Sequence, residues 1–173
     1  MYDHTIESLP EENEKFLWHK IGLTGKFDEA TEDLGTLPDF IQKNGHDNET
    51  DMILKVDIEG AEYDVFANLD EAILKKFRQI VIEFHKLTDP SMKEKITTAV
   101  SNLNKTHQLV HIHANNWGHY SLCAGKLLPE LLECTYVNKD NYQFVDNTRS
   151  FPTILDQPNN IRRPDVFLGR WND

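Results

Sequence analysis

Short apolar runs alternate along the chain with polar segments of helical character. The runs at 16–23, 53–58, 79–85, 107–116 and 131–140 are bounded by turn residues or by charged residues, which predicts strands. The segments between them begin at N-cap residues or carry apolar residues at helical spacing. The alternation predicts an α/β fold.

Capping residues define the expected helices. Thr36, with Asp39 three residues later, predicts a short helix over 36–45 that a glycine ends. Asp89 and the proline after it predict the start of a helix that continues to about residue 104. Further helical stretches are expected at 61–66 and 70–77.

The pattern changes near residue 140. Beyond it, Pro152, Pro158 and Pro164 interrupt a polar segment in which no periodic apolar pattern is visible. We therefore expect a partial α/β domain over residues 1–140 and an irregular tail over 141–173 that is packed on or beside it.

Composition narrows the classes of partner. The 173 residues include 39% hydrophobic residues, as in folded proteins, and the net charge of −11 argues against nucleic acid or an anionic membrane as the main partner. Cys123 and Cys134 form no CxxC motif, and the first residues contain no apolar segment that would act as a signal or anchor. These features predict a cytoplasmic protein with free thiols.

The segment ILKVDIEGAEYDVF (53–66) brings three carboxylates to the end of an expected strand. Asp57 lies where the apolar run ends, so its carboxylate must be solvated in a crevice, paired or bound to a cation. Ligands of open parallel sheets bind at this end of the strands. Glu59 and Glu62 have a second interpretation, as an acid in the turn and an acid at a helix start.

The next strand repeats this arrangement. Glu83 and His85 lie two residues apart near the end of the run at 79–85, so they are expected on one face. If the two strands are neighbours, Asp57, Glu83 and His85 converge on one crevice. A carboxylate beside a histidine fits either a general base or part of a divalent-cation site. A histidine that only satisfies its hydrogen bonds at a strand end remains the alternative for His85.

A third group lies in HIHANNWGH, where His111 and His113 share a face and Asn115, Asn116 and His119 follow. An HxH pair can bind zinc, but no second pair at helical spacing and no cysteine cluster accompanies it. Side chains that line a pocket rim, or a plain strand and loop, are the other interpretations.

The string KVDIEGAE, followed by a strand that ends in IEFH, resembles the FkbM-type S-adenosylmethionine-dependent methyltransferases. Their hallmark at the fourth strand of a Rossmann-like sheet is matched by Lys55, Asp57, Glu59, Gly60 and Glu62. The segments VHIHANN, LECTYV and FPTILDQPNNIRRPD are similar to the C-terminal part of a subgroup of this family.

The resemblance also implies features that this sequence lacks. The eight glycines form no GxGxxG or GxGxG string, so the glycine-rich cofactor loop and first strand of the family are missing. Asp3 in MYDHT matches the position of the acid that binds the ribose. In the family's strand order, 3-2-1-4-5-7-6, an N-terminally truncated sheet leaves the fourth strand with an open edge. A gene fragment, a partner chain that supplies the missing half and a rearranged family member each explain the omission.

The activity that the resemblance implies is methyl transfer from S-adenosylmethionine to a hydroxyl of a small molecule or glycan. Asp57, Glu83 and His85 are the expected catalytic residues and the expected ligands of a divalent cation such as magnesium, and Asp3 and Asp57 are expected to bind the cofactor. A non-catalytic remnant or binding module, and a metal-dependent hydrolase that also uses His113, are the alternatives. The open sheet edge predicts self-association.

Overall fold

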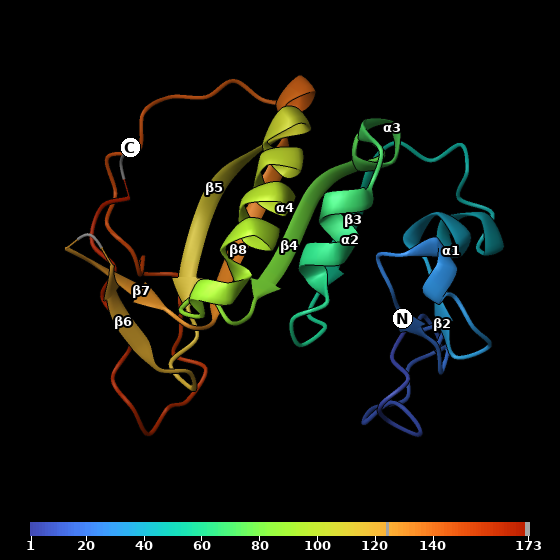
Figure 1. The fold of residues 1–173 in the computed structure, drawn as a ribbon, viewed down its shortest axis with the longest axis horizontal. Coiled ribbons are helices and arrows are strands. Elements are labelled where there is room, and N and C mark those ends of the chain that lie inside the picture. Colours follow the sequence, from blue (N-terminus) through green and yellow to red (C-terminus); the bar gives the residue numbers. More distant parts are fainter. Residues whose placement is uncertain (124, 172–173) are drawn as a thin grey trace.

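The computed structural model describes residues 1–123 and 125–171 (Figure 1). Its strands are β1 (Gly22–Leu23), β2 (Leu34–Gly35), β3 (Met52–Val56), β4 (Phe77–Phe84), β5 (His107–Ala114), β6 (Tyr120–Cys123), β7 (Lys126–Pro129) and β8 (Leu132–Asn138). Its α-helices are α1 (Leu37–Lys43), α2 (Glu62–Asn68), α3 (Glu71–Leu74) and α4 (Lys93–Thr106), with 3-10 turns at Phe27–Glu29, Pro90–Met92 and Lys139–Asn141. The fold is α/β, as predicted.

A four-stranded sheet with the order β3-β4-β8-β5 forms the centre of the molecule. Strands β3 and β4 run parallel, and β8 pairs antiparallel with both β4 and β5. Because β4 and β5 therefore point the same way as β3, the carboxyl ends of these three strands meet at one edge. Asp57, His85 and Asn115 directly follow the three strands and lie at this edge.

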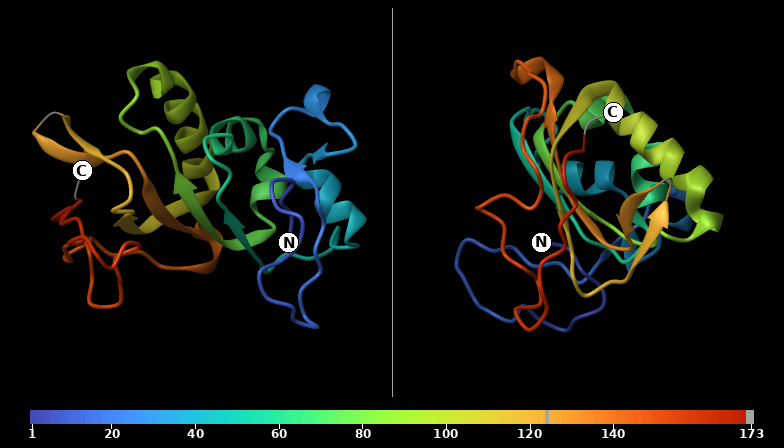
Figure 2. Two further views of the ribbon diagram at one scale, coloured as in Figure 1. Left: turned by 90° about the horizontal axis from the view of Figure 1, so that it is seen from below. Right: turned by 90° about the vertical axis from the view of Figure 1, so that its left-hand side faces the viewer.

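Helices α2 and α4 cover one face of the sheet (Figures 1 and 2). On β4, Ile80 and Ile82 point to this face and are fully buried. They belong to one hydrophobic core with Phe66 of α2 and Leu103 of α4. Apolar residues alternate along the strand and recur at helical spacing in α4, so each element has one apolar face. These two faces are buried against each other.

The opposite face of the sheet is polar. The register of β4, β8 and β5 aligns Glu83, Glu133 and His113 in one row across three strands. The neighbouring row contains Thr135 and His111. This face gathers carboxylate and imidazole side chains from strands that lie far apart in the sequence.

The segment that follows the last 3-10 turn lies along this polar face (Figure 2). Residues 142–171 contain neither a helix nor a longer strand, and one isolated bridge joins Phe151 to Gly169. Phe151 and Val166 are nevertheless buried and join the hydrophobic core. The tail is therefore irregular in its backbone but ordered by a few side chains.

The predicted first helix is confirmed together with its cap. The Thr36 hydroxyl accepts a hydrogen bond from the backbone of Asp39, whose carboxylate accepts one from the backbone of Thr36. Gly45, with φ +70°, ends the helix in the left-handed conformation that glycine adopts readily. Local sequence alone specifies this element.

One expectation was wrong, and one element was not predicted. The predicted strand at 16–23 is reduced to Gly22–Leu23, which pairs with β2, and to an isolated bridge between His19 and Tyr2. Without a continuous partner strand, the apolar residues at its start remain exposed. The hairpin of β6 and β7 was not predicted, because all four residues of β6 are exposed and provide no apolar pattern.

Candidate functional site

The turn after β3 is built by two consecutive residues in the left-handed region. Glu59 has φ +57° and Gly60 has φ +107°, and α2 begins two residues later. A Cβ at Gly60 would lie 3.2 Å from the Nζ of Lys86, and the φ itself disfavours other residues. The turn directs the chain from the strand end back along the sheet and brings the Glu59 carboxylate to its edge.

Glu62 connects this turn to the end of β4. Its side chain is fully buried and accepts hydrogen bonds from the backbone N–H groups of Gly60 (2.8 Å) and His85 (2.7 Å). Its Oε1 also lies 3.2 Å from Nδ1 of the His85 ring. A buried carboxylate needs such partners, so Glu62 stabilises the site rather than reacting in it.

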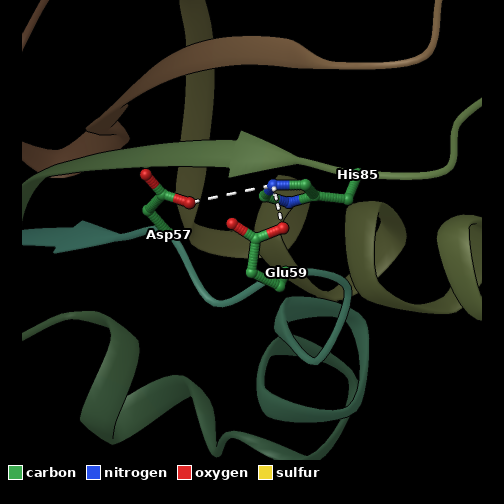
Figure 3. A group of neighbouring side chains, drawn as sticks. All are labelled: Asp57, Glu59 and His85. Atoms are coloured by element: carbon green, nitrogen blue, oxygen red, sulfur yellow. Dashed lines mark ion pairs between the residues drawn. The ribbon is translucent and has the colours of Figure 1, made fainter. Parts of the chain in front are cut away.

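His85 lies at the centre of a group of acidic side chains (Figure 3). Its Nε2 is 3.8 Å from Oδ1 of Asp57 and 3.5 Å from Oε2 of Glu59. The His85 residue is 7% exposed, and its backbone carbonyl accepts a hydrogen bond from the Tyr63 hydroxyl. The site therefore combines a rigidly held imidazole with two carboxylates that remain accessible.

Neighbouring charges and burial shift two of the acid–base groups. The hydrogen bond that His85 donates to Glu62, together with the other carboxylates, raises the pKa of His85 although burial opposes the shift. Burial raises the pKa of Glu83, and the hydrogen bond from Asn115 partly offsets this effect. Both shifts favour the protonated form of the group concerned.

Glu83 lies beside this group and not within it. Its Oε1 accepts a hydrogen bond from the Asn115 side chain at 2.8 Å, and its row neighbour on β8 is Glu133. Among the described residues, the histidine and acidic side chains whose ligand atoms all lie within 4.8 Å of one another are Asp57, Glu59 and His85. The structure thus brings together Asp57 and His85 of the predicted cation ligands, and Glu59 is the third member.

A cavity of about 220 Å³ opens next to Glu83 on the polar face. It is lined by Lys55, Val81, Ile82, Glu83, His111, His113, Glu133, Thr135 and Asp156. A larger cavity of about 530 Å³ lies between the loop after β1, the start of α1 and helix α2, and it contains no member of the His85 group. The smaller cavity also contains none of the three, but its lining residue Lys55 forms an ion pair with Asp57.

The HIHANN residues hold the tail on the sheet. His113 Nδ1 lies 3.0 Å from Glu133 and its Nε2 lies 3.1 Å from Asp165, while His111 Nε2 lies 2.8 Å from Asp156. Each imidazole is therefore engaged by carboxylates. A zinc site made by this pair is not among the groups with metal-binding spacing in the described residues.

Asn116 and His119, from the same motif, also have local partners. The Asn116 amide donates to the carbonyls of Asn160 and Pro164, and His119 Nδ1 lies 2.7 Å from Glu130. Asn115 instead donates to Glu83, which lies beside the His85 group.

Asp3 lies in the N-terminal turn. Its Oδ1 accepts hydrogen bonds from the backbone (2.7 Å) and the hydroxyl (2.6 Å) of Thr5, and these bonds lower the pKa of its carboxyl group.

Sequence reasoning did not foresee that Glu59 joins the acidic group. The consecutive pattern of acid, glycine and acid was the available signal, because it marks a turn at a strand end.

The fold and the site define an α/β protein with an imidazole–carboxylate group at the carboxyl edge of its sheet. A family model of the methyltransferase FkbM domain matches residues 6–137. Because the match spans more than half of the chain, the protein belongs to the FkbM methyltransferase family, and the predicted resemblance is confirmed. No curated protein and no solved structure matches the chain. None of its described helices is long and apolar enough to cross a membrane.

Proposed function

We propose that this protein takes part in S-adenosylmethionine-dependent methyl transfer to a hydroxyl oxygen of a small molecule or glycan. The observation that carries the proposal is the folded form of the family string. Lys55 is exposed near the end of β3. Asp57 and Glu59 lie at the sheet edge, and Glu62 is buried next to His85. The string thus forms a supported site rather than a chance sequence match.

The topology also supports the proposal. The order β3-β4-β8-β5 corresponds to strands 4-5-7-6 of the Rossmann-like sheet that the family resemblance implies. The last strand, β8, lies antiparallel between its neighbours. In open α/β sheets, ligands bind outside the carboxyl ends of the parallel strands, which is where Asp57 lies.

The residues present fit part of the proposed cofactor. Both hydrogen bonds of Asp3 use Oδ1, which leaves Oδ2 of this half-buried side chain for the hydroxyls of a ribose. Asp57 is the second proposed contact, since its side chain is 39% exposed at the sheet edge. S-adenosylmethionine, when bound, supplies a methyl group on a reactive sulfonium.

In the proposed reaction, the protein orients the acceptor and accepts the proton of its hydroxyl group. In this proposal Asp57 accepts the proton of the acceptor hydroxyl, and His85, 3.8 Å from the Asp57 carboxylate, orients the same group. The cavity next to Glu83 offers carboxylate, hydroxyl and ammonium groups, from Glu83, Thr135 and Lys55. Such a lining suits an acceptor that carries several hydroxyl groups.

A non-catalytic binding module is the second candidate function. The glycines of residues 1–173 are scattered, and none of them forms the glycine-rich string that approaches the methionine portion of the cofactor in the family. Isothermal titration calorimetry with S-adenosylmethionine separates the two candidates. Micromolar binding that weakens in the Asp3→Asn and Asp57→Asn variants supports the methyltransferase, whereas no measurable heat supports the module.

The matched control is Asp47→Asn, which removes an exposed carboxylate from a loop before β3. It should bind S-adenosylmethionine as the wild type does. If all three variants bind equally, the proposed cofactor contacts are wrong. If Asp57→Asn, measured at saturating S-adenosylmethionine, lowers the transfer rate to a hydroxylated acceptor about 100-fold or more, the role of Asp57 as a base is supported.

A further inference from the structure

We propose that Asp57, Glu59 and His85 form a binding site for a divalent transition-metal ion at the carboxyl edge of the sheet. One ligand atom of each residue lies within 4.8 Å of the other two. The side chains come from two neighbouring strand ends and point toward one another (Figure 3). The inference goes beyond methyl transfer, because it depends on these residues and not on S-adenosylmethionine.

The buried Glu62 carboxylate orients the imidazole for metal binding. It already accepts two backbone N–H groups, and its Oε1 faces Nδ1 of His85 at 3.2 Å. Because a carboxylate only accepts hydrogen bonds, Nδ1 carries a proton, and whenever the ring is neutral its lone pair is therefore on Nε2, where a metal ion would replace the second proton. A histidine that binds a metal ion through one ring nitrogen commonly donates the N–H of its other ring nitrogen to a carboxylate.

The lone pair of Nε2 faces two further acceptors. Oε2 of Glu59 is 3.5 Å away and Oδ1 of Asp57 is 3.8 Å away, and His85 is more than nine-tenths buried. Within residues 1–123 and 125–171, Nε2 has no hydrogen-bond partner at normal length. Three sets of lone pairs that face one another repel unless a positive charge lies between them.

The spacing also fits a metal ion between the three groups. A proton on Nε2 would draw one carboxylate oxygen to a hydrogen-bond distance of about 2.8 Å. Two ligands that each lie about 2.1 Å from a tetrahedral ion are about 3.4 Å apart. The 3.5 Å and 3.8 Å separations are close to this second value.

The ligand types indicate the kind of ion. Imidazole suits Zn²⁺ and other first-row transition ions, and carboxylates suit Mn²⁺, whereas Mg²⁺ prefers oxygen ligands throughout. The side chains of Asp57 and Glu59 are 39% and 88% exposed, so their side of the ion faces solvent. An ion held by three protein ligands therefore retains open positions for water or for an oxygen of a ligand.

Mn²⁺ alone is the probe for the test. Electron paramagnetic resonance of free Mn²⁺, titrated into the metal-free chain, should show one bound ion per chain. Glu59→Gln and Asp57→Asn should each weaken binding about tenfold or more. Because the Glu59 side chain is 88% exposed, its substitution leaves the fold intact, which circular dichroism checks. Glu49→Gln, which alters an exposed loop acid, should bind as the wild type does.

Two outcomes would overturn the site. One is a wild-type chain that takes up no Mn²⁺. The other is uptake that is equal in the wild type, Glu59→Gln and Asp57→Asn, which would assign the ion to scattered surface acids. A calorimetric titration of the same metal-free protein with S-adenosylmethionine reports separately on the proposed function, so the failure of one does not imply the failure of the other.

Discussion

Oε1 of Glu62 accepts a hydrogen bond from the backbone N–H of His85 at 2.7 Å, although the two residues are 23 positions apart. The same oxygen faces Nδ1 of the imidazole at 3.2 Å. One buried carboxylate thus connects the turn after β3 with the end of β4. The positions of Asp57 and Glu59 relative to His85 depend on this connection.

Removal of the Glu62 carboxylate should destabilise the protein strongly. Glu62→Ala leaves the backbone N–H groups of Gly60 and His85 without acceptors, which should lower the free energy of unfolding by about 3 kcal/mol. Urea unfolding followed by circular dichroism measures the change. Glu94→Ala removes an exposed acid from the first turn of α4 and should cost less than about 1 kcal/mol. Equal losses in the two variants would show that Glu62 does not support the site.

His113 should make stability depend on pH in the alkaline range. The carboxylates of Glu133 and Asp165 raise its pKa to about 9, although burial opposes the shift. Its contribution is therefore fully present below the unfolded value of about 6.5 and is lost as the pH rises through about 9. The free energy of unfolding should fall by on the order of 3 kcal/mol over this window.

The measurement is the urea midpoint as a function of pH for the wild type and His113→Gln. The variant should lose the decline between pH 7 and 10, because glutamine does not titrate. His46→Gln, in an exposed loop, should keep the decline. A decline of the same size in His113→Gln would assign the pH dependence to other groups.

Loss of the Asn116 side chain should release the tail locally. Its amide donates to the carbonyls of Asn160 and Pro164, and its oxygen accepts the backbone N–H of Asn160 at 2.7 Å. In Asn116→Ala, trypsin should cleave after Arg162 several-fold faster, with the products identified by mass spectrometry. Asn48→Ala, on an exposed loop, should leave the rate unchanged. If both variants are cleaved alike, Asn116 does not anchor the tail.

The open edge of β3 should favour self-association. Among the described residues β3 pairs only with β4, and Ile53 on this edge strand is 55% exposed. A lysine at an edge strand opposes pairing with another chain, so Ile53→Lys should shift the sedimentation profile toward monomer. Leu155→Lys changes an exposed apolar residue of the tail instead and should leave the profile unchanged. A wild-type chain that is monomeric at high concentration would contradict the expectation.

The sequence pattern correctly predicted the elements that interactions between neighbouring residues specify. The capping box of Thr36 and Asp39 specified α1, and Asp89 capped the turn that leads into α4. The strand at 16–23 was predicted wrongly because apolar residues form a strand only where a partner is available. The hairpin after β5 was missed because its exposed residues carry no periodic signal.

The sequence by itself determined the motif and the family to which it belongs, and it predicted that Asp57 and His85 converge if their strands are neighbours. Only the tertiary structure decided which acid joins them. Side chains two positions apart share a face of a sheet only if both residues lie in the strand. Because β4 ends before His85, this rule does not place His85 on the face of Glu83. The ring therefore turns toward Glu62, and the left-handed turn brings Glu59 there instead of Glu83. Contacts between residues 23 positions apart depend on the packing of the whole sheet, and no local pattern encodes them.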